Sequence, residues 1–178
     1  MTKKLRVEKG NSIMKVIDSA PLGATIIVSA GVYKECVLIS KDLILCGEEG
    51  SKIEAVGDKP ALALGAGCCS KVSGLKMNSD STQTETVVVS GGDHVILRCD
   101  IQAQSMSGVL IWKGANVALR ECTIHGSKQA GVVVLNVRQC ILKGNTITKN
   151  AHGVAIQSPY DPTTSATTTT TTTTCASS

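Results

Sequence analysis

Aromatic residues are nearly absent from this 178-residue sequence, which contains no phenylalanine, one tryptophan and two tyrosines. An apolar core must therefore be built from valine, isoleucine, leucine, alanine and cysteine. β-Branched residues fit the pleated surface of a strand better than a helix, and the 17 glycines fit frequent tight turns. The composition predicts one all-β domain rather than a helical protein.

Strong charge and long apolar runs are also lacking. The formal net charge is only +4, and no basic helix is evident, so we expect no nucleic-acid partner. No apolar run approaches the length needed to cross a bilayer, and residues 1–6 do not resemble a secretory leader. We therefore expect no membrane partner and a cytoplasmic location, with the cytoskeleton or a cilium or flagellum as the more specific expectation.

The eight cysteines form no metal or redox motif. There is no C-x-x-C pair and no Cys/His cluster with the spacing of a zinc site, so neither a metal nor a cofactor is expected. Cys99 and Cys122 stand inside apolar segments, where a thiol behaves as a small hydrophobic side chain. Reduced thiols are predicted, which also favours an intracellular protein.

The strongest pattern is a repeat between residues 86 and 156. An apolar segment of the form Gly/Thr-Val-x-Val/Ile begins at residues 86, 108, 131 and 153, at intervals of 22, 23 and 22 residues. A second apolar segment begins nine residues after each of the first three starts, at Val95, Val117 and Cys140. A third segment closes each unit with an isoleucine. Self-similarity at a fixed period is typical of a solenoid, so three short strands per coil are predicted.

The flanking sequences differ in character from the repeat. Residues 1–11 form a basic lead-in, and residues 12–20 carry apolar residues at helical spacing, which predicts a short helix capping the solenoid. Residues 159–178 are rich in threonine, and a tract of this kind is predicted to be a low-complexity tail. The expected β-helix domain therefore covers residues 12–158.

Two stretches resemble a known family. The first contains Ile26-Ile-Val28, Ala30-Gly-Val-Tyr-Lys-Glu35 and Leu43-Ile-Leu45, and it resembles the opening coils of right-handed parallel β-helix proteins, including pectin methylesterases. The second, Asn145-x-Ile147-x-x-Asn150-x-x-Gly153, is similar to the repeat of the pectin-lyase-like superfamily. That repeat also occurs in non-enzymatic intracellular proteins, such as F-box proteins and SHC SH2-domain-binding proteins. The resemblance implies a right-handed parallel β-helix of five to six coils with a short N-terminal capping helix.

The first segment of each unit has apolar residues on both faces. Because strand residues alternate between faces, Val87 and Val89 are predicted to point inward. A solvated outward face should be polar, and an exposed apolar patch usually marks a partner. We therefore predict an interaction patch for a protein partner, with coverage by the tail or a loop as the alternative. The outward residues of this patch are Val88, Leu110, Trp112, Val133 and Leu135.

The second segment is followed by a cation in each of three units. Val95 and Leu97 are predicted to point inward, with a basic row of Arg98, Arg120 and Lys143 beside them. Like charges stacked in this way repel unless they are countered. Either nearby carboxylates or an acidic segment of a protein partner would supply the counter-charge. The carboxylates in question are Asp93, Asp100 and Glu121.

No catalytic residue is predicted. Carbohydrate-active proteins that resemble this fold place clustered carboxylates at outward strand positions, whereas Asp93, Asp100 and Glu121 fall on different elements. The leading prediction is a non-catalytic scaffold or protein-interaction module, a structural component of a large intracellular assembly. The alternative is a carbohydrate-active or carbohydrate-binding protein of the pectin-lyase-like type (lyase, esterase or hydrolase), with an acidic polysaccharide as its ligand.

Overall fold

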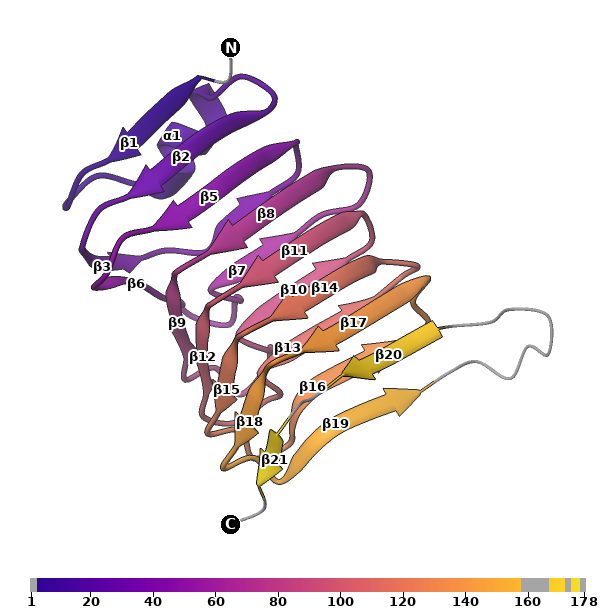
Figure 1. Cartoon of the computed structure of the whole chain (residues 1–178). Helices are drawn as coiled ribbons and strands as arrows, with labels where there is room; N and C mark the ends of the chain where they lie inside the picture. The colour runs from indigo at the N-terminus through magenta and orange to yellow at the C-terminus, as the bar shows by residue number, and fades with distance from the viewer. Residues whose placement is uncertain (1–2, 158–166, 172–173, 177–178) are drawn as a thin grey trace.

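The chain winds into a parallel β-helix of about seven turns in the computed structural model (Figure 1). The structure describes residues 3–157, 167–171 and 174–176. The predicted all-β fold class is confirmed, although the number of turns is higher than the five to six expected from the repeat. The difference arises because residues 4–7 and the described strands at 167–171 and 174–176 also pair with the coil.

Three parallel sheets form the walls, and each coil passes through them in the order C, A, B. Sheet C consists of β4 (Val37–Ile39), β7 (Leu62–Leu64), β10 (Val87–Ser90), β13 (Val109–Trp112), β16 (Ala130–Leu135) and β19 (His152–Gln157). Sheet A consists of β1 (Lys4–Val7), β2 (Ala24–Val28), β5 (Leu43–Gly47), β8 (Cys69–Ser73), β11 (Asp93–Leu97), β14 (Asn116–Arg120), β17 (Gln139–Lys143) and β20 (Thr167–Thr171). Sheet B consists of β3 (Gly31–Lys34), β6 (Ser51–Glu54), β9 (Lys76–Ser79), β12 (Asp100–Ala103), β15 (Thr123–His125), β18 (Thr146–Thr148) and β21 (Thr174–Ala176).

The β-helix extends beyond the predicted domain bounds at both ends. Lys4–Val7, inside the predicted lead-in, pairs with β2 in sheet A. Within the threonine-rich segment, Thr167–Thr171 pairs with β17 and Thr174–Ala176 pairs with β18. Threonine is β-branched and suits a strand, so a composition that suggested a tail is also compatible with a coil. Residues 158–166, 172–173 and 177–178 lie outside the described part.

The helix α1 (Ile13–Ser19) covers the N-terminal end of the core, as the sequence predicted. Ile13 and Ile17 are buried in the core cluster. The Glu35 carboxylate accepts hydrogen bonds from the backbone N–H groups of Ile13 at 2.8 Å and Met14 at 3.1 Å. The first turn of the helix is thereby bound to the coil beneath it. Among the described residues, no helix is long and apolar enough to cross a membrane.

A left-handed residue makes the sharp corner between sheets A and B. Gly74, Arg98, Glu121 and Gly144 occupy this corner in successive coils, with φ between 50° and 70°. Glycine adopts this conformation without strain, whereas Arg98 and Glu121 each cost about 1 kcal/mol. The residue after the corner points inward. Leu75, Cys99, Cys122 and Asn145 are all buried there.

The register of sheet A differs from the predicted one. His94, not Val95, is opposite Val117, and Ile96 is opposite Leu119. Consequently His94 and Ile96 point inward, and Val95 and Leu97 point outward. The extra residue of the longer coil lies in the turn between sheets C and A. Ser90 still pairs with Trp112, 22 residues on, whereas Asp93 pairs with Asn116, 23 residues on.

A close approach explains the glycines Gly108 and Gly131 in two of the sheet C segments. A Cβ atom on Gly108 would lie 2.6 Å from Cγ2 of Ile124 and 2.7 Å from the carbonyl oxygen of Gly131. These distances are shorter than van der Waals contact, so any side chain would force the coils apart. The glycine of the Gly-Val-x-Val pattern is therefore needed for neighbouring coils to pack closely.

Asn145 secures the corner of its coil by two hydrogen bonds. Its Oδ1 accepts from the backbone N–H of Cys122 at 2.9 Å, and its Nδ2 donates to the carbonyl of Leu119 at 3.0 Å. The side chain is only 1 % exposed, so water cannot replace either bond. Removing it would leave two buried backbone groups without partners.

We expect Asn145→Ala to lower the free energy of unfolding by about 2–4 kcal/mol, because two backbone groups lose their partners in a buried site. Chemical denaturation followed by circular dichroism measures the change. Thr146→Ala, at the next and exposed position, is the matched control and should change stability by less than about 0.5 kcal/mol. Equal stabilities for the two variants would contradict this role of Asn145.

His94 belongs to the core rather than to a solvated turn. Its Nδ1 lies 2.8 Å from Ser70 Oγ, and its Nε2 lies 2.9 Å from the carbonyl of Gly91 and 3.1 Å from that of Gly65. This arrangement fits a neutral imidazole that donates from Nε2 and accepts from the serine hydroxyl. Burial lowers the pKa of His94 below its ordinary value, because the charged form is poorly solvated.

Protonation of His94 should therefore destabilise the fold. The unfolded chain takes up this proton near pH 6.5 and the folded chain does so only at lower pH, so the free energy of unfolding should decrease as the pH falls from about 7 to about 5. Denaturation across this range measures the slope. His94→Gln should reduce the slope; identical slopes for wild type and His94→Gln would refute the assignment.

Candidate interaction surfaces

Sheet C presents a continuous apolar column to solvent. Val88 on β10, Leu110 on β13 and Val133 on β16 are in register, so their outward side chains stack. Leu38 and Ala63 extend the column in one direction and Ala155 in the other. The five residues of the predicted patch are half-buried, whereas Leu38 is 45 % exposed. The structure thus brings together the whole predicted patch and adds Leu38, which lies in a coil before the regular repeat.

Trp112 and Leu135 form a second apolar row on the same face. Ile111 pairs with Val134, which places Trp112 beside Leu135. The Lys113 ammonium lies 4.1 Å from the centre of the indole ring, a cation–π arrangement. Among the described residues, the buried indole N–H of Trp112 has no hydrogen-bond acceptor. A large aromatic side chain at the middle of an apolar face is the usual anchor of a protein interface.

The described part of the threonine-rich segment does not lie across sheet C. Thr167–Thr171 joins sheet A and Thr174–Ala176 joins sheet B. These strands therefore continue the coil instead of covering the apolar column. A role of this column in binding a separate partner remains a prediction.

Only two of the three residues of the predicted basic row are in register with each other. Arg120 and Lys143 are in register on β14 and β17 and both are exposed, but Arg98 lies at the corner, and Leu97 takes its expected place beside Arg120. Two of the carboxylates expected to counter the row are engaged elsewhere. Asp100 pairs with His125 at 2.9 Å, and Asp93 accepts a hydrogen bond from Asn116 at 2.7 Å.

Sheet A also has an outward apolar band, which the sequence did not predict. The band consists of Ile44, Val95, Leu97 and Ile141, all of them half-buried. The shifted register concealed it, because Val95 and Leu97 were assigned to the interior. A constant 23-residue spacing from Cys99 to Cys122 to Asn145 is the signal that would have revealed the correct register.

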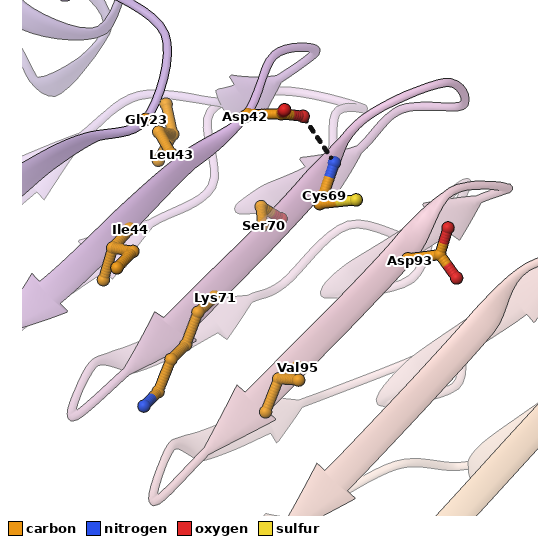
Figure 2. A pocket seen from close by; sticks show the side chains of 9 residues that line it. All are labelled: Gly23, Asp42, Leu43, Ile44, Cys69, Ser70, Lys71, Asp93 and Val95. Atoms are coloured by element: carbon orange, nitrogen blue, oxygen red, sulfur yellow. Dashed lines mark hydrogen bonds between the residues drawn. The ribbon is translucent and has the colours of Figure 1, made fainter.

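A hollow of about 340 Å³ opens on sheet A between β5 and β11, with β8 as its floor (Figure 2). Asp42, Cys69 and Asp93 line the end where the strands begin, and the backbone N–H of Cys69 donates to Asp42 Oδ1 at 2.8 Å. Ile44 and Val95 form the two sides, and the Lys71 side chain extends along the floor between them. The remaining lining residues are Gly23, Leu43 and Ser70.

Sheet B carries the pair that most resembles an acid–base site. His125 Nε2 lies 2.9 Å from Asp100 Oδ1, and both side chains are partly exposed. The other strand carboxylate of this sheet, Glu54, pairs with Lys52 at 2.8 Å. Within the described residues, no group of three histidine, cysteine, aspartate or glutamate side chains is placed to hold a metal ion.

Four thiols of the described part of the chain are buried: those of Cys68, Cys99, Cys122 and Cys140. Cys68 is buried and Cys69 is exposed, so the two neighbours point to opposite sides of the coil. Burial raises the pKa of the Cys140 thiol to about 11. A thiol of this kind stays protonated at neutral pH and is a poor nucleophile.

A solved structure of a mutant pectin methylesterase in complex with a hexasaccharide is similar to this chain, with a TM-score of 0.60 and 16 % sequence identity. The match covers 85 % of this chain and 57 % of the enzyme, so the chain spans little more than half of that protein. At this identity the likeness shows the fold alone.

No curated protein sequence matches the chain. The family model described as "right handed beta helix region" matches residues 65–176. This span is more than half of the chain and includes the complete sequence repeat, the hollow's Cys69, Ser70 and Lys71, and the described part of the threonine-rich segment. The chain belongs to the right-handed β-helix family.

Proposed function

We propose that this β-helix is a non-catalytic interaction module whose sheet C face binds a protein partner. The observation that carries the proposal is the apolar column that runs over six strands, from Leu38 through Val88 and Leu110 to Ala155. With the row of Trp112 and Leu135, it forms a surface of about a few hundred Å², the size at which an apolar patch implies a partner.

The chemistry of the same face supports binding over catalysis. None of the described strands of sheet C carries an aspartate or a glutamate. The carboxylates on strands of the other sheets lie beside cationic or amide groups, as Glu54 beside Lys52 and Asp93 beside Asn116. A glycoside hydrolase needs two carboxyl groups that flank the bond to be broken, and no such arrangement is present on the sheet C strands.

The more specific part of the proposal is a structural role in a large intracellular assembly, cytoskeletal or ciliary. A solenoid presents long flat faces and suits a scaffold. Four cysteines, Cys68, Cys99, Cys122 and Cys140, serve as buried apolar side chains, a use of thiols that suits a reducing compartment.

Polar substitutions on sheet C should abolish binding without affecting the fold. We expect the triple variant Leu110→Ser, Trp112→Ser, Val133→Ser to reduce recovery of the partner at least tenfold, because truncating an aromatic anchor and its apolar neighbours removes most of such an interface. Quantitative mass spectrometry of proteins recovered from the source's extract measures the loss, and circular dichroism checks the β-structure.

The matched control is the variant Val32→Ser, Val56→Ser, which removes two apolar residues of 52 % and 50 % exposure away from sheet C. It should recover the same partner as the wild type. Unchanged recovery by the triple variant would show that sheet C is not the interface. Sedimentation of the purified protein tells whether the partner is a second copy of the chain.

A carbohydrate-active function is the alternative that the likeness to a pectin methylesterase structure favours. The acid–base pair available for it is Asp100 with His125. We expect no release of methanol from methylated pectin and no cleavage of polygalacturonate above a blank. Activity that disappears in Asp100→Ala would replace the binding proposal with an enzymatic one.

A further inference from the structure

The outward face of sheet A is polarised along the direction of its strands. Carboxylates lie where the first of these strands begin, with Asp42 before β5 and Asp93 at the start of β11. Arg138, directly before β17, lies 3.6 Å from Asp93 and partly offsets its charge. Cations lie where the strands end, with Arg120 and Lys143 as the last residues of β14 and β17. Between these two margins runs a column of outward residues that is apolar except for Lys71: Ile44, Lys71, Val95, Ala118 and Ile141. Leu97 lies in the same row as Arg120 and Lys143.

The cations of this face have no counter-charge within the described part of the chain. Lys71, Arg98, Arg120 and Lys143 take part in none of its ion pairs, which use other cations. Arg120 and Lys143 stack directly, one above the other, and so repel each other. A ligand that brings carboxylates to this margin would relieve the repulsion and gain charge-assisted hydrogen bonds.

The dimensions of the face suit a helix that lies across the strands. Adjacent strands are about 4.8 Å apart, close to the 5.4 Å pitch of an α-helix, so one apolar residue per helical turn meets one strand. From β5 to β17 the band spans about 19 Å, the length of about 13 helical residues. The hollow between Ile44 and Val95 provides a recess for one large apolar side chain (Figure 2).

We propose that sheet A binds an amphipathic helix of a partner protein, with acidic residues along one flank. The apolar stripe of the helix lies on Ile44, Val95 and Ile141, and one side chain fills the hollow. Its acidic flank lies along Arg120 and Lys143, and its opposite flank, polar or cationic, lies beside Asp42 and Asp93. This site is distinct from the apolar column of sheet C and was concealed in the sequence by the shift in register.

An anionic membrane surface is the alternative to a helix, because it too binds a protein face that combines cations with apolar residues. The carboxylates argue against it, because Asp42 and Asp93 lie at the mouth of the same hollow and would repel lipid phosphates. A helix can match both margins at once, since its two flanks can differ in charge. A uniformly anionic surface cannot.

A phage-displayed library of 16-residue helical peptides, selected on the full chain, tests the proposal. Enriched peptides should combine an apolar stripe with acidic residues along one flank. Their affinity, measured by fluorescence anisotropy with labelled peptides, should fall at least tenfold in the variant Arg120→Glu, Lys143→Glu. It should also weaken as the salt concentration rises, because exposed charges are screened. Both substituted residues are exposed, so the variant should fold, and circular dichroism checks this.

The matched control is Lys34→Glu, Lys76→Glu, which makes the same change in net charge on the exposed face of sheet B. It should change the affinity less than twofold, as should the sheet C triple variant. The proposal is overturned if no acidic amphipathic peptide is enriched, or if the enriched peptides bind Arg120→Glu, Lys143→Glu as tightly as the wild type. It is also overturned if phosphatidylserine vesicles bind this face and no peptide does.

Discussion

In-register parallel stacking of the coils is the constraint on which the rest of the structure depends. Strand by strand, each coil pairs with the next, and even the corners take part: the N–H of Arg98 donates to the carbonyl of Arg120 at 2.9 Å, and that of Glu121 to Lys143 at 2.9 Å. Each side chain therefore has its own counterparts above and below it. A residue type is suited to a position only if it packs well against the residues above and below it. Aliphatic side chains meet this condition, and large aromatic ones are almost absent from the chain.

The same constraint makes the three faces chemically different from one another. Stacking makes sheet C an apolar column, whereas sheet A has carboxylates at the start of β11 and before β5, cations at the ends of β14 and β17, and a mainly apolar column between them. Clustered carboxylates, which carbohydrate chemistry on such a scaffold requires, are costly to stack. Those on the described strands lie singly, beside groups that stabilise them, as Asp100 does beside His125. Extended surfaces of uniform character suit recognition of other macromolecules, and this is the basis of both binding proposals.

Much of the fold could be predicted from the sequence. The repeat predicted the β-helix and the alignment of Val88, Leu110 and Val133, and the helical spacing in residues 12–20 predicted the capping helix. The predicted register of sheet A was wrong because one turn between sheets C and A is longer than the preceding one. Two residues lie between Ser90 and Asp93, whereas three lie between Trp112 and Asn116. Spacing from one segment start to the next does not tell which turn holds the extra residue. A slip of one residue reverses every side chain of a strand, so Val95 and Leu97 were placed in the core.

The sequence by itself determined the fold class, because period, glycine positions and a core without phenylalanine are local properties that every coil repeats. It also determined the sheet C patch, since both faces of that segment are apolar and no choice of register changes this. Only the tertiary structure decided the character of sheet A, the place of Arg98 at a corner and the joining of residues 4–7 and 167–171 to the coil. These features depend on which residues of neighbouring coils lie opposite one another. That backbone pairing forms only when the coils stack, so the composition of the sequence does not reveal it.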